Sequence, residues 1–189
     1  MIMINAVLDA CVLYSAPLRD FLLRLAEAKL FAPFWSEEIQ SEWTRRLLEN
    51  RPDLKRENLE RTRRKMNLHF PRGHVWGYEA ITSTLHLPDT NDRHVLAAAI
   101  HVKAEYIVTN NLADFPNAIL QFYNVEAVLP DELVMRLIQK RPDRVLKVVK
   151  LHRSRLIRPP RTVGEYLATL EEQGLYKTVA FLRQYKDNI

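Results

Sequence analysis

Several acidic residues in this sequence lie where a folded chain could bring carboxylates together. Residues 87–102, LPDTNDRHVLAAAIHV, begin with two aspartates and continue into an apolar run typical of a buried helix. Capping of that helix can explain Asp89, because Asp is a good N-cap residue. Asp92 is different, since it falls on the helical face of the apolar residues Leu96 and Ala99. A carboxylate on a buried face needs a partner or a metal ion.

Three more acids lie beside apolar segments that are expected to be buried. Asp9 directly follows the apolar run 2–8, and Asp114 lies in the loop TNNLADFP after the apolar EYIVT. In parallel α/β sheets, ligands bind beyond the carboxyl ends of the strands, where both acids are expected. Glu42 stands beside the apolar stripe of a predicted helix and can point inward.

The four acids Asp9, Glu42, Asp92 and Asp114 thus converge by topology and predict a site for a hard divalent cation. Mg²⁺, with Mn²⁺ as a substitute, prefers such oxygen ligands. Capping or solvation explains each acid taken alone, so the prediction depends on the set. A glycine-rich phosphate loop, a GxSxG elbow and a His-x-x-x-His pair are all absent from the sequence.

The elements that must position these acids alternate along the chain. Apolar runs at 2–8, 105–110 and 124–129 predict strands, and a short apolar run at 30–35 leads to Ser36. Periodic segments at 18–29, 36–50, 51–66 and 90–103 predict helices. The pattern of 75–86 is ambiguous. This alternation is typical of an α/β fold with a mostly parallel sheet.

The end of the chain reads as helical. Helices follow from residue 130, with a capping box at 162–165 and a stop at Gly174, and the double proline at 159–160 separates two of them. The single cysteine, Cys11, excludes an internal disulfide and indicates a reducing compartment, here the cytoplasm. The apolar beginning is too short to span a bilayer, so we expect no membrane association.

Charge is distributed unevenly around a total of +5. Residues 45–65 carry nine Lys or Arg against four acids, and residues 131–189 carry thirteen against seven. Basic segments therefore flank acidic ones, as expected for a polyanion-binding surface around a metal site. Solvation of the outer helix faces is the alternative explanation of any one basic run.

Four segments in this order resemble the PIN-domain ribonucleases, in particular the VapC-type toxins of bacterial type II toxin-antitoxin pairs. They read VLDACVLYSAPLRDFLLRLAEA, WSEEIQSEW, LPDTNDRHVLAAAI and YIVTNNLADFP. The resemblance covers roughly residues 1–130, and LHRSRLIRPPRTVGEYLATLEEQGL resembles the helical extension of some of these toxins. It implies a PIN-like three-layer α/β/α nuclease domain at 1–130 and a small all-helical C-terminal extension at 131–189.

The resemblance also implies roles for single residues. The metal-binding acids of the family fall on Asp9, Glu42, Asp92 and Asp114. Accompanying positions near the site match Asp89, Thr109 and Asn111, the last two as the T and N of a T-x-N signature. Where the family usually has Asn, Ser or Thr, this chain has Cys11, whose thiol is a poorer hydrogen-bond donor and predicts weaker support for Asp9.

The function implied is that of a Mg²⁺-dependent endoribonuclease that acts as a growth-inhibiting toxin. Its expected partners are an RNA substrate and a small cognate antitoxin protein, and a homodimer is allowed. Candidate contacts to RNA phosphates are Arg45, Arg46, Arg61, Arg63, Arg64 and Lys65. Core packing is the expected role of the tryptophans, with base stacking as the alternative.

Other functions stay open at this point. A PIN-like module could bind nucleic acid without cutting it, and a nuclease could act in RNA processing or on DNA. A phospho-acceptor signalling domain also gathers acids at strand ends. It would need a second acid beside Asp9 and a Lys near Thr109, which the sequence lacks.

Overall fold

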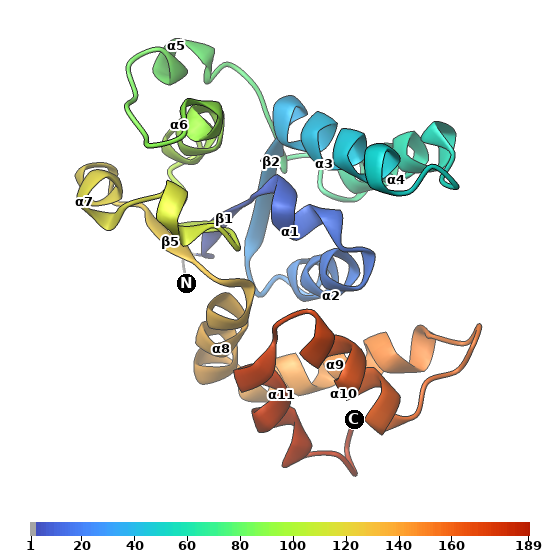
Figure 1. The fold of residues 1–189 in the computed structure, drawn as a ribbon. Coiled ribbons are helices and arrows are strands. Elements are labelled where there is room, and N and C mark those ends of the chain that lie inside the picture. Colours follow the sequence, from blue (N-terminus) through green and yellow to red (C-terminus); the bar gives the residue numbers. More distant parts are fainter. Residues whose placement is uncertain (1–2) are drawn as a thin grey trace. The chain divides into compact units, whose positions relative to one another are not determined.

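The chain builds a parallel sheet whose strand order reverses in the middle. The computed structural model describes residues 3–189. Its five strands pair in parallel in the order β3-β2-β1-β4-β5 (Figure 1). Their bounds are Asn5–Leu8 for β1, Ala32–Ser36 for β2, His74–Val75 for β3, Tyr106–Val108 for β4 and Glu126–Val128 for β5. The reversal between β1 and β4 leaves a crevice at their carboxyl ends.

The central strands are apolar on both sides. Val7, Leu8, Ile107 and Val108 are fully buried, as expected for a parallel sheet with helices on both faces. Helix α6, Arg93–His101, packs on β1, β2 and β4. The predicted α/β/α three-layer class with a parallel sheet is confirmed.

The remaining helices of the first part of the chain surround the sheet edges. They are α1 (Ala10–Tyr14), α3 (Glu37–Asn50), α4 (Arg56–His69), α5 (Glu79–Thr82) and α7 (Asn117–Leu120), with the 3₁₀ turns η1 (Thr90–Asp92), η2 (Leu112–Asp114) and η3 (Gln121–Tyr123). Helix α3 begins where Ser36 Oγ accepts the Ile39 N–H. It contacts α1, β2 and α4, and it runs beside α4 in Figure 1.

Some element predictions need correction. Residues 51–66 do not continue the preceding helix, because a turn after Asn50 interrupts it and α4 starts anew at Arg56. The helix predicted at 90–103 opens as a 3₁₀ turn. The two-residue strand β3 and the short helix α1 were not predicted, since neither is long enough to show periodicity. The first strand begins at Asn5, and residue 2 of the predicted run lies outside the described residues.

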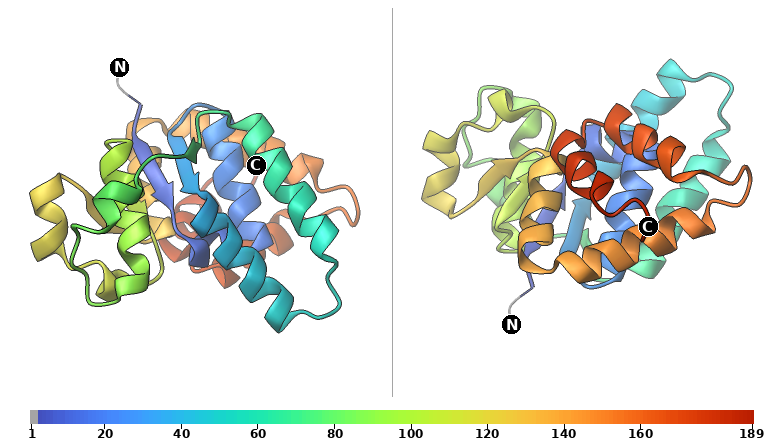
Figure 2. Two further views of the ribbon diagram at one scale, coloured as in Figure 1. Left: turned by 90° about the horizontal axis from the view of Figure 1, so that it is seen from above. Right: turned by 90° about the horizontal axis from the view of Figure 1, so that it is seen from below.

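The chain forms two compact units. The first combines residues up to Tyr14 with Phe31–Val128, and the second combines Ser15–Leu30 with Leu129–Ile189. Helix α2 (Ala16–Glu27) therefore belongs to the second unit, which also holds α8 (Pro130–Lys140), α9 (Pro142–Arg155), α10 (Val163–Glu172) and α11 (Tyr176–Arg183). Figure 2 shows α8 to α11 grouped together, coloured orange to red.

Helix α2 is tied to its neighbours in the second unit by an apolar face and a polar chain. It contacts α9 and α10. His152 lies 3.0 Å from Asp20 through Nε2 and 2.9 Å from the Tyr166 hydroxyl through Nδ1. Hydrogen bonding to His152, more than any other cause, holds the pKa of Asp20 below its usual 3.8. Within residues 3–189, no helix combines the length and apolar character that crossing a membrane requires.

Candidate functional site

Asp9 lies at the carboxyl end of β1 with its carboxylate fixed from three sides. It is 6% exposed. Its Oδ1 accepts the Ala10 N–H at 2.6 Å, and its Oδ2 accepts the Thr109 hydroxyl at 2.7 Å. Thr109 follows β4, and its Oγ1 accepts the Asn111 N–H at 3.0 Å. Of the T-x-N signature, Thr109 thus contacts Asp9 directly, and the Asn111 backbone N–H binds the Thr109 hydroxyl.

Cys11 completes this arrangement. Its thiol donates to Asp9 Oδ2 at 3.1 Å and accepts the Asn110 N–H at 3.2 Å. Burial, and then the charge of Asp9, raises the pKa of the thiol to about 12. Cys11 thus remains protonated at neutral pH and can donate to the carboxylate.

Asp92 lies among other carboxylates. Its pKa is raised from 3.8 to about 7, first by burial and then by the charges of Asp9, Asp114, Asp89 and Glu42. Mutual repulsion of this kind requires proximity. The charges of Asp9, Asp114, Asp89 and Glu42 therefore act on Asp92. Asp89 has a local task as well, since its side chain accepts the Asn91 N–H at 2.8 Å and caps η1.

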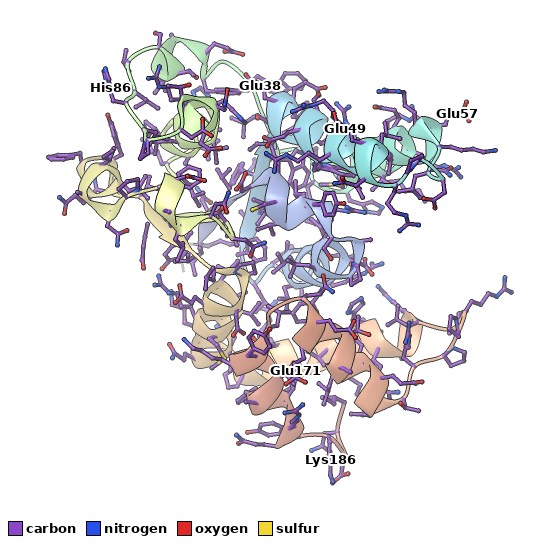
Figure 3. The ribbon with its side chains drawn as sticks, viewed as in Figure 1. Glu38, Glu49, Glu57, His86, Glu171 and Lys186 are labelled. Atoms are coloured by element: carbon purple, nitrogen blue, oxygen red, sulfur yellow. The ribbon has the colours of Figure 1, made fainter. Side chains whose placement is uncertain are left out.

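A polar groove of about 670 Å³ opens beside these acids. Glu42, Asp89 and Asp92 line it. Its other walls are Glu38, Ser41, Thr44, Arg45, Arg46, Arg56, Arg63, Asn91 and His94. Its lining residues on α3 run from Glu38, labelled in Figure 3, to Arg46, so the groove follows that helix from its beginning into its second half. Acidic and basic side chains thus face one space.

The predicted phosphate-binding residues differ in how closely they pair with neighbouring side chains and in how exposed they are. Arg46 Nη2 lies 2.7 Å from Glu42 Oε1, and Arg63, only 14% exposed, pairs with both Glu37 and Glu60. Arg45 approaches Glu49 at 3.7 Å, and Arg61 donates to Asn58. Arg64 and Lys65 are exposed on α4. Arg61, Arg64 and Lys65 do not line the groove, so only part of the predicted basic set faces it.

Six groove residues lie outside the predicted set, namely Glu38, Ser41, Thr44, Arg56, Asn91 and His94. Arg56 begins α4 within the basic run but was not selected. His94, two residues after Asp92, is buried, and its Nε2 lies 3.9 Å from Glu42 Oε2. Its place on the inner side of the predicted helix was a usable signal. Arg56 offered none, because its position depends on the turn that separates α4 from α3.

The four candidate acids Asp9, Glu42, Asp92 and Asp114 fit a divalent ion in their chemistry but not in their positions. All candidate ligands are carboxylate oxygens, as Mg²⁺ and Mn²⁺ prefer. Burial raises the pKa of Asp92 first, and the carboxylate charges that raise it further are ones that a cation would neutralise. Within residues 3–189, however, no group of three or more His, Cys, Asp or Glu is arranged closely enough to hold a metal. The Arg46–Glu42 ion pair accounts for part of this difference, because it directs one Glu42 oxygen to the guanidinium. The donor chemistry fits the ion, whereas the side chains do not form a closed ligand set.

Comparison with known proteins agrees with the fold. Residues 5–113 match the family described as "PIN domain". Because this match covers more than half of the chain, the chain belongs to the PIN-domain family. Residues 130–184 match a second family, "VapC50 C-terminal domain". The predicted resemblance to a VapC-type PIN domain followed by a C-terminal extension is thereby confirmed.

One curated relative shares a substantial segment. "Putative ribonuclease VapC50" from Mycobacterium tuberculosis (strain ATCC 25618 / H37Rv) is 38% identical over 82 residues, which cover 43% of this chain and 48% of that protein. The match thus spans about half the length of the relative. No solved structure shows significant similarity to this chain.

Proposed function

We propose that this protein is a metal-dependent endoribonuclease that acts as the toxin of a toxin-antitoxin pair. The observation that carries the proposal is a groove lined by the carboxylates of Glu42, Asp89 and Asp92 together with arginines. Membership of the PIN-domain family and the ribonuclease name of its relative support it. A small antitoxin protein is the partner that this function requires.

Asp9, Glu42, Asp92 and Asp114 would hold Mg²⁺ or Mn²⁺. When bound, such an ion activates a water molecule and stabilises the leaving oxygen of a phosphodiester. Thr109 and Cys11 keep the Asp9 carboxylate oriented through their hydrogen bonds. Arg45 and Arg56 can neutralise phosphates in the groove, whereas Arg46 and Arg63 must share their charge with carboxylates.

The second candidate is a module that binds nucleic acid without cutting it. The Arg46–Glu42 ion pair favours this alternative, because it occupies an oxygen that a metal ion would need. Both functions use the same groove. They differ in whether a divalent ion changes what happens to bound RNA.

The proposal is tested by incubating the full chain and RNA with Mg²⁺, with Mn²⁺ or with EDTA, and by resolving the products on a denaturing gel. Cleavage is expected with either metal and not with EDTA. Asp92→Asn should lower the cleavage rate by more than about 100-fold, because it removes a charged ligand. Asp53→Asn is the matched control, since Asp53 is exposed and pairs with Arg51.

The possible outcomes separate the two candidates. Cleavage that persists in EDTA, or an Asp92→Asn protein as active as the wild type, would contradict the proposed chemistry. RNA binding by the wild type without cleavage under any metal condition would support the non-cutting module. Circular dichroism of each variant establishes that the fold is retained.

A further inference from the structure

Trp76 is an exposed aromatic residue that the proposed function leaves without a task. It is 66% exposed, whereas Trp35 and Trp43 are fully buried. The expected packing role is thus confirmed for two of the three tryptophans. An indole so exposed loses the free energy of burial, about 25 cal/mol per Å² of apolar surface. It is therefore a candidate for contact with another molecule.

Trp76 directly follows the edge strand β3. It thus lies on the side of the sheet where the strands have their carboxyl ends, as the candidate site does. Asp9 follows β1 and Thr109 follows β4 in the same parallel sheet, so all three residues stand at carboxyl ends. Gly77 adopts a φ of +77°, which turns the chain sharply after Trp76. The sheet topology therefore places this indole on the side of the acids.

The indole has a rigid support. The centroid of the His74 ring lies 3.8 Å from that of Trp76, at an interplanar angle of 51°. His74 is held by Asn67, whose Nδ2 lies 3.4 Å from its Nδ1, while its Nε2 approaches Glu37 Oε2 at 3.6 Å without a hydrogen bond. Asn67 is itself fixed, since its side-chain oxygen accepts the Trp35 indole N–H at 2.9 Å. One side of Trp76 thus rests on an anchored ring while most of its surface stays open.

Two chains of contacts connect this position to the groove. Glu37, which approaches His74, also pairs with Arg63, and Arg63 lines the groove. The Tyr78 hydroxyl donates to Glu38 Oε1 at 3.0 Å, and Glu38 lines the groove as well. Trp76 is therefore joined to the groove wall through residues on both sides of it in sequence.

We propose that Trp76, supported by His74, is a stacking platform for an unpaired base of an RNA strand whose phosphates lie in the arginine-lined groove. Aromatic side chains beside a positively charged groove stack successive bases because every base has a π-face. The inference rests on the proposed function and adds a binding residue to it. Because the contact is made by a base rather than a phosphate, it should be insensitive to salt.

The test measures binding of oligoadenylate to the full chain in EDTA, by filter binding and by tryptophan fluorescence. Trp76→Ala should weaken affinity by about 5- to 150-fold, the range for the loss of one stacked base. Trp76→Phe should restore most of it, and the salt slope should be the same in all three proteins. Oligoadenylate should quench the emission of Trp76 in the wild type, whereas a strand of abasic sugars should not.

Phe122→Ala is the matched control. Phe122 is 77% exposed and lies in η3, which leads into the amino end of β5 and so stands at the opposite sheet edge. Its replacement should leave RNA affinity unchanged. An equal loss in Phe122→Ala and Trp76→Ala would overturn the inference, because it would show only a general effect of exposed aromatic residues.

Failure of the inference is distinguishable from failure of the proposed function. A wild type that cleaves RNA while Trp76→Ala binds oligoadenylate equally well would overturn the stacking role and leave the nuclease intact. The same result with loss of a co-purified antitoxin would assign Trp76 to a protein interface instead. A wild type that neither binds nor cleaves RNA would overturn both.

Discussion

At the scale of single residues, Cys11 is the point where this chain departs from the pattern of the family it resembles. Its thiol donates to Asp9 Oδ2 and accepts the Asn110 N–H. The raised pKa keeps the proton on sulfur at neutral pH. A thiol is a weak donor, however, and the shorter bond to the same oxygen comes from Thr109, at 2.7 Å. Thr109 therefore supports Asp9 Oδ2 more strongly than Cys11 does.

Replacement of Cys11 tests this division of tasks. In Cys11→Asn, the side-chain amide can donate to Asp9 and its carbonyl can accept the Asn110 N–H, so both contacts have a counterpart. We expect cleavage at limiting Mg²⁺ to be unchanged or faster by up to about 10-fold, because groups that orient a ligand affect metal affinity on this scale. Initial rates across a Mg²⁺ titration provide the measurement.

Cys11→Ala is the comparison, since it removes the donor and should raise the Mg²⁺ concentration needed for half-maximal rate. A Cys11→Asn protein that folds but cleaves nothing at any Mg²⁺ concentration would show that the thiol has another role.

At the scale of elements, the edge strand β3 depends on a close approach at Gly73. A Cβ at this position would lie 2.9 Å from the Pro33 carbonyl oxygen and 3.1 Å from that of Phe70. The Gly73 carbonyl in turn accepts the Trp35 N–H at 2.8 Å. Glycine is required here because the backbone of the neighbouring strand leaves no room, and β3 in turn places His74 and Trp76.

Gly73→Ala should therefore destabilise the protein by about 1–3 kcal/mol, the cost of overpacking. Gly164→Ala is a matched substitution in α10, where a Cβ meets nothing within 4 Å. It should stabilise the protein by about 0.5–1 kcal/mol, because alanine loses less backbone entropy in a helix. Urea denaturation with unchanged m-values measures both. A Gly73→Ala protein as stable as the wild type would mean that β2 and β3 separate without cost.

At the scale of the whole molecule, the two compact units do not correspond to a single cut in the sequence. Helix α2 precedes most of the sheet in sequence, yet it belongs to the unit of the C-terminal helices. The domain boundary predicted at residue 130 stays a prediction. It would leave α2 without α9 and α10, which it contacts.

A chain shortened to residues 1–130 should consequently fold poorly. Leu18, Phe21, Leu22 and Leu25 are each no more than 2% exposed. Exposure of four such side chains costs on the order of 6–12 kcal/mol, comparable to the 5–15 kcal/mol that stabilises a typical domain. Solubility on expression and the cooperativity of urea unfolding are the measurements. Co-expression of residues 131–189 should restore solubility, and a soluble, cooperatively unfolding 1–130 fragment would contradict the expectation.

The sequence by itself determined the features that depend on neighbours along the chain. Apolar runs indicated three of the five strands, β1, β4 and β5, and the capping box at Thr162 and the stop at Gly174 predicted helix ends that the structure contains. The positions of Asp9 and Asp114 after strands indicated a common crevice, because parallel strands end at one edge of a sheet. The predictions of strands and helix ends succeeded because hydrogen-bonding geometry and side-chain periodicity act over a few residues, whereas the common crevice of Asp9 and Asp114 stays a prediction.

Only the tertiary structure decided which side chains and helices contact one another. The pairing of Arg46 with Glu42, the support of Trp76 by His74 and the membership of α2 in the second unit follow from packing. Periodicity could not reveal β3, since two residues carry no pattern. Nor could it show that Trp76 is exposed while Trp35 is buried, because burial depends on what the rest of the chain places over a residue, and no local sequence signal records that.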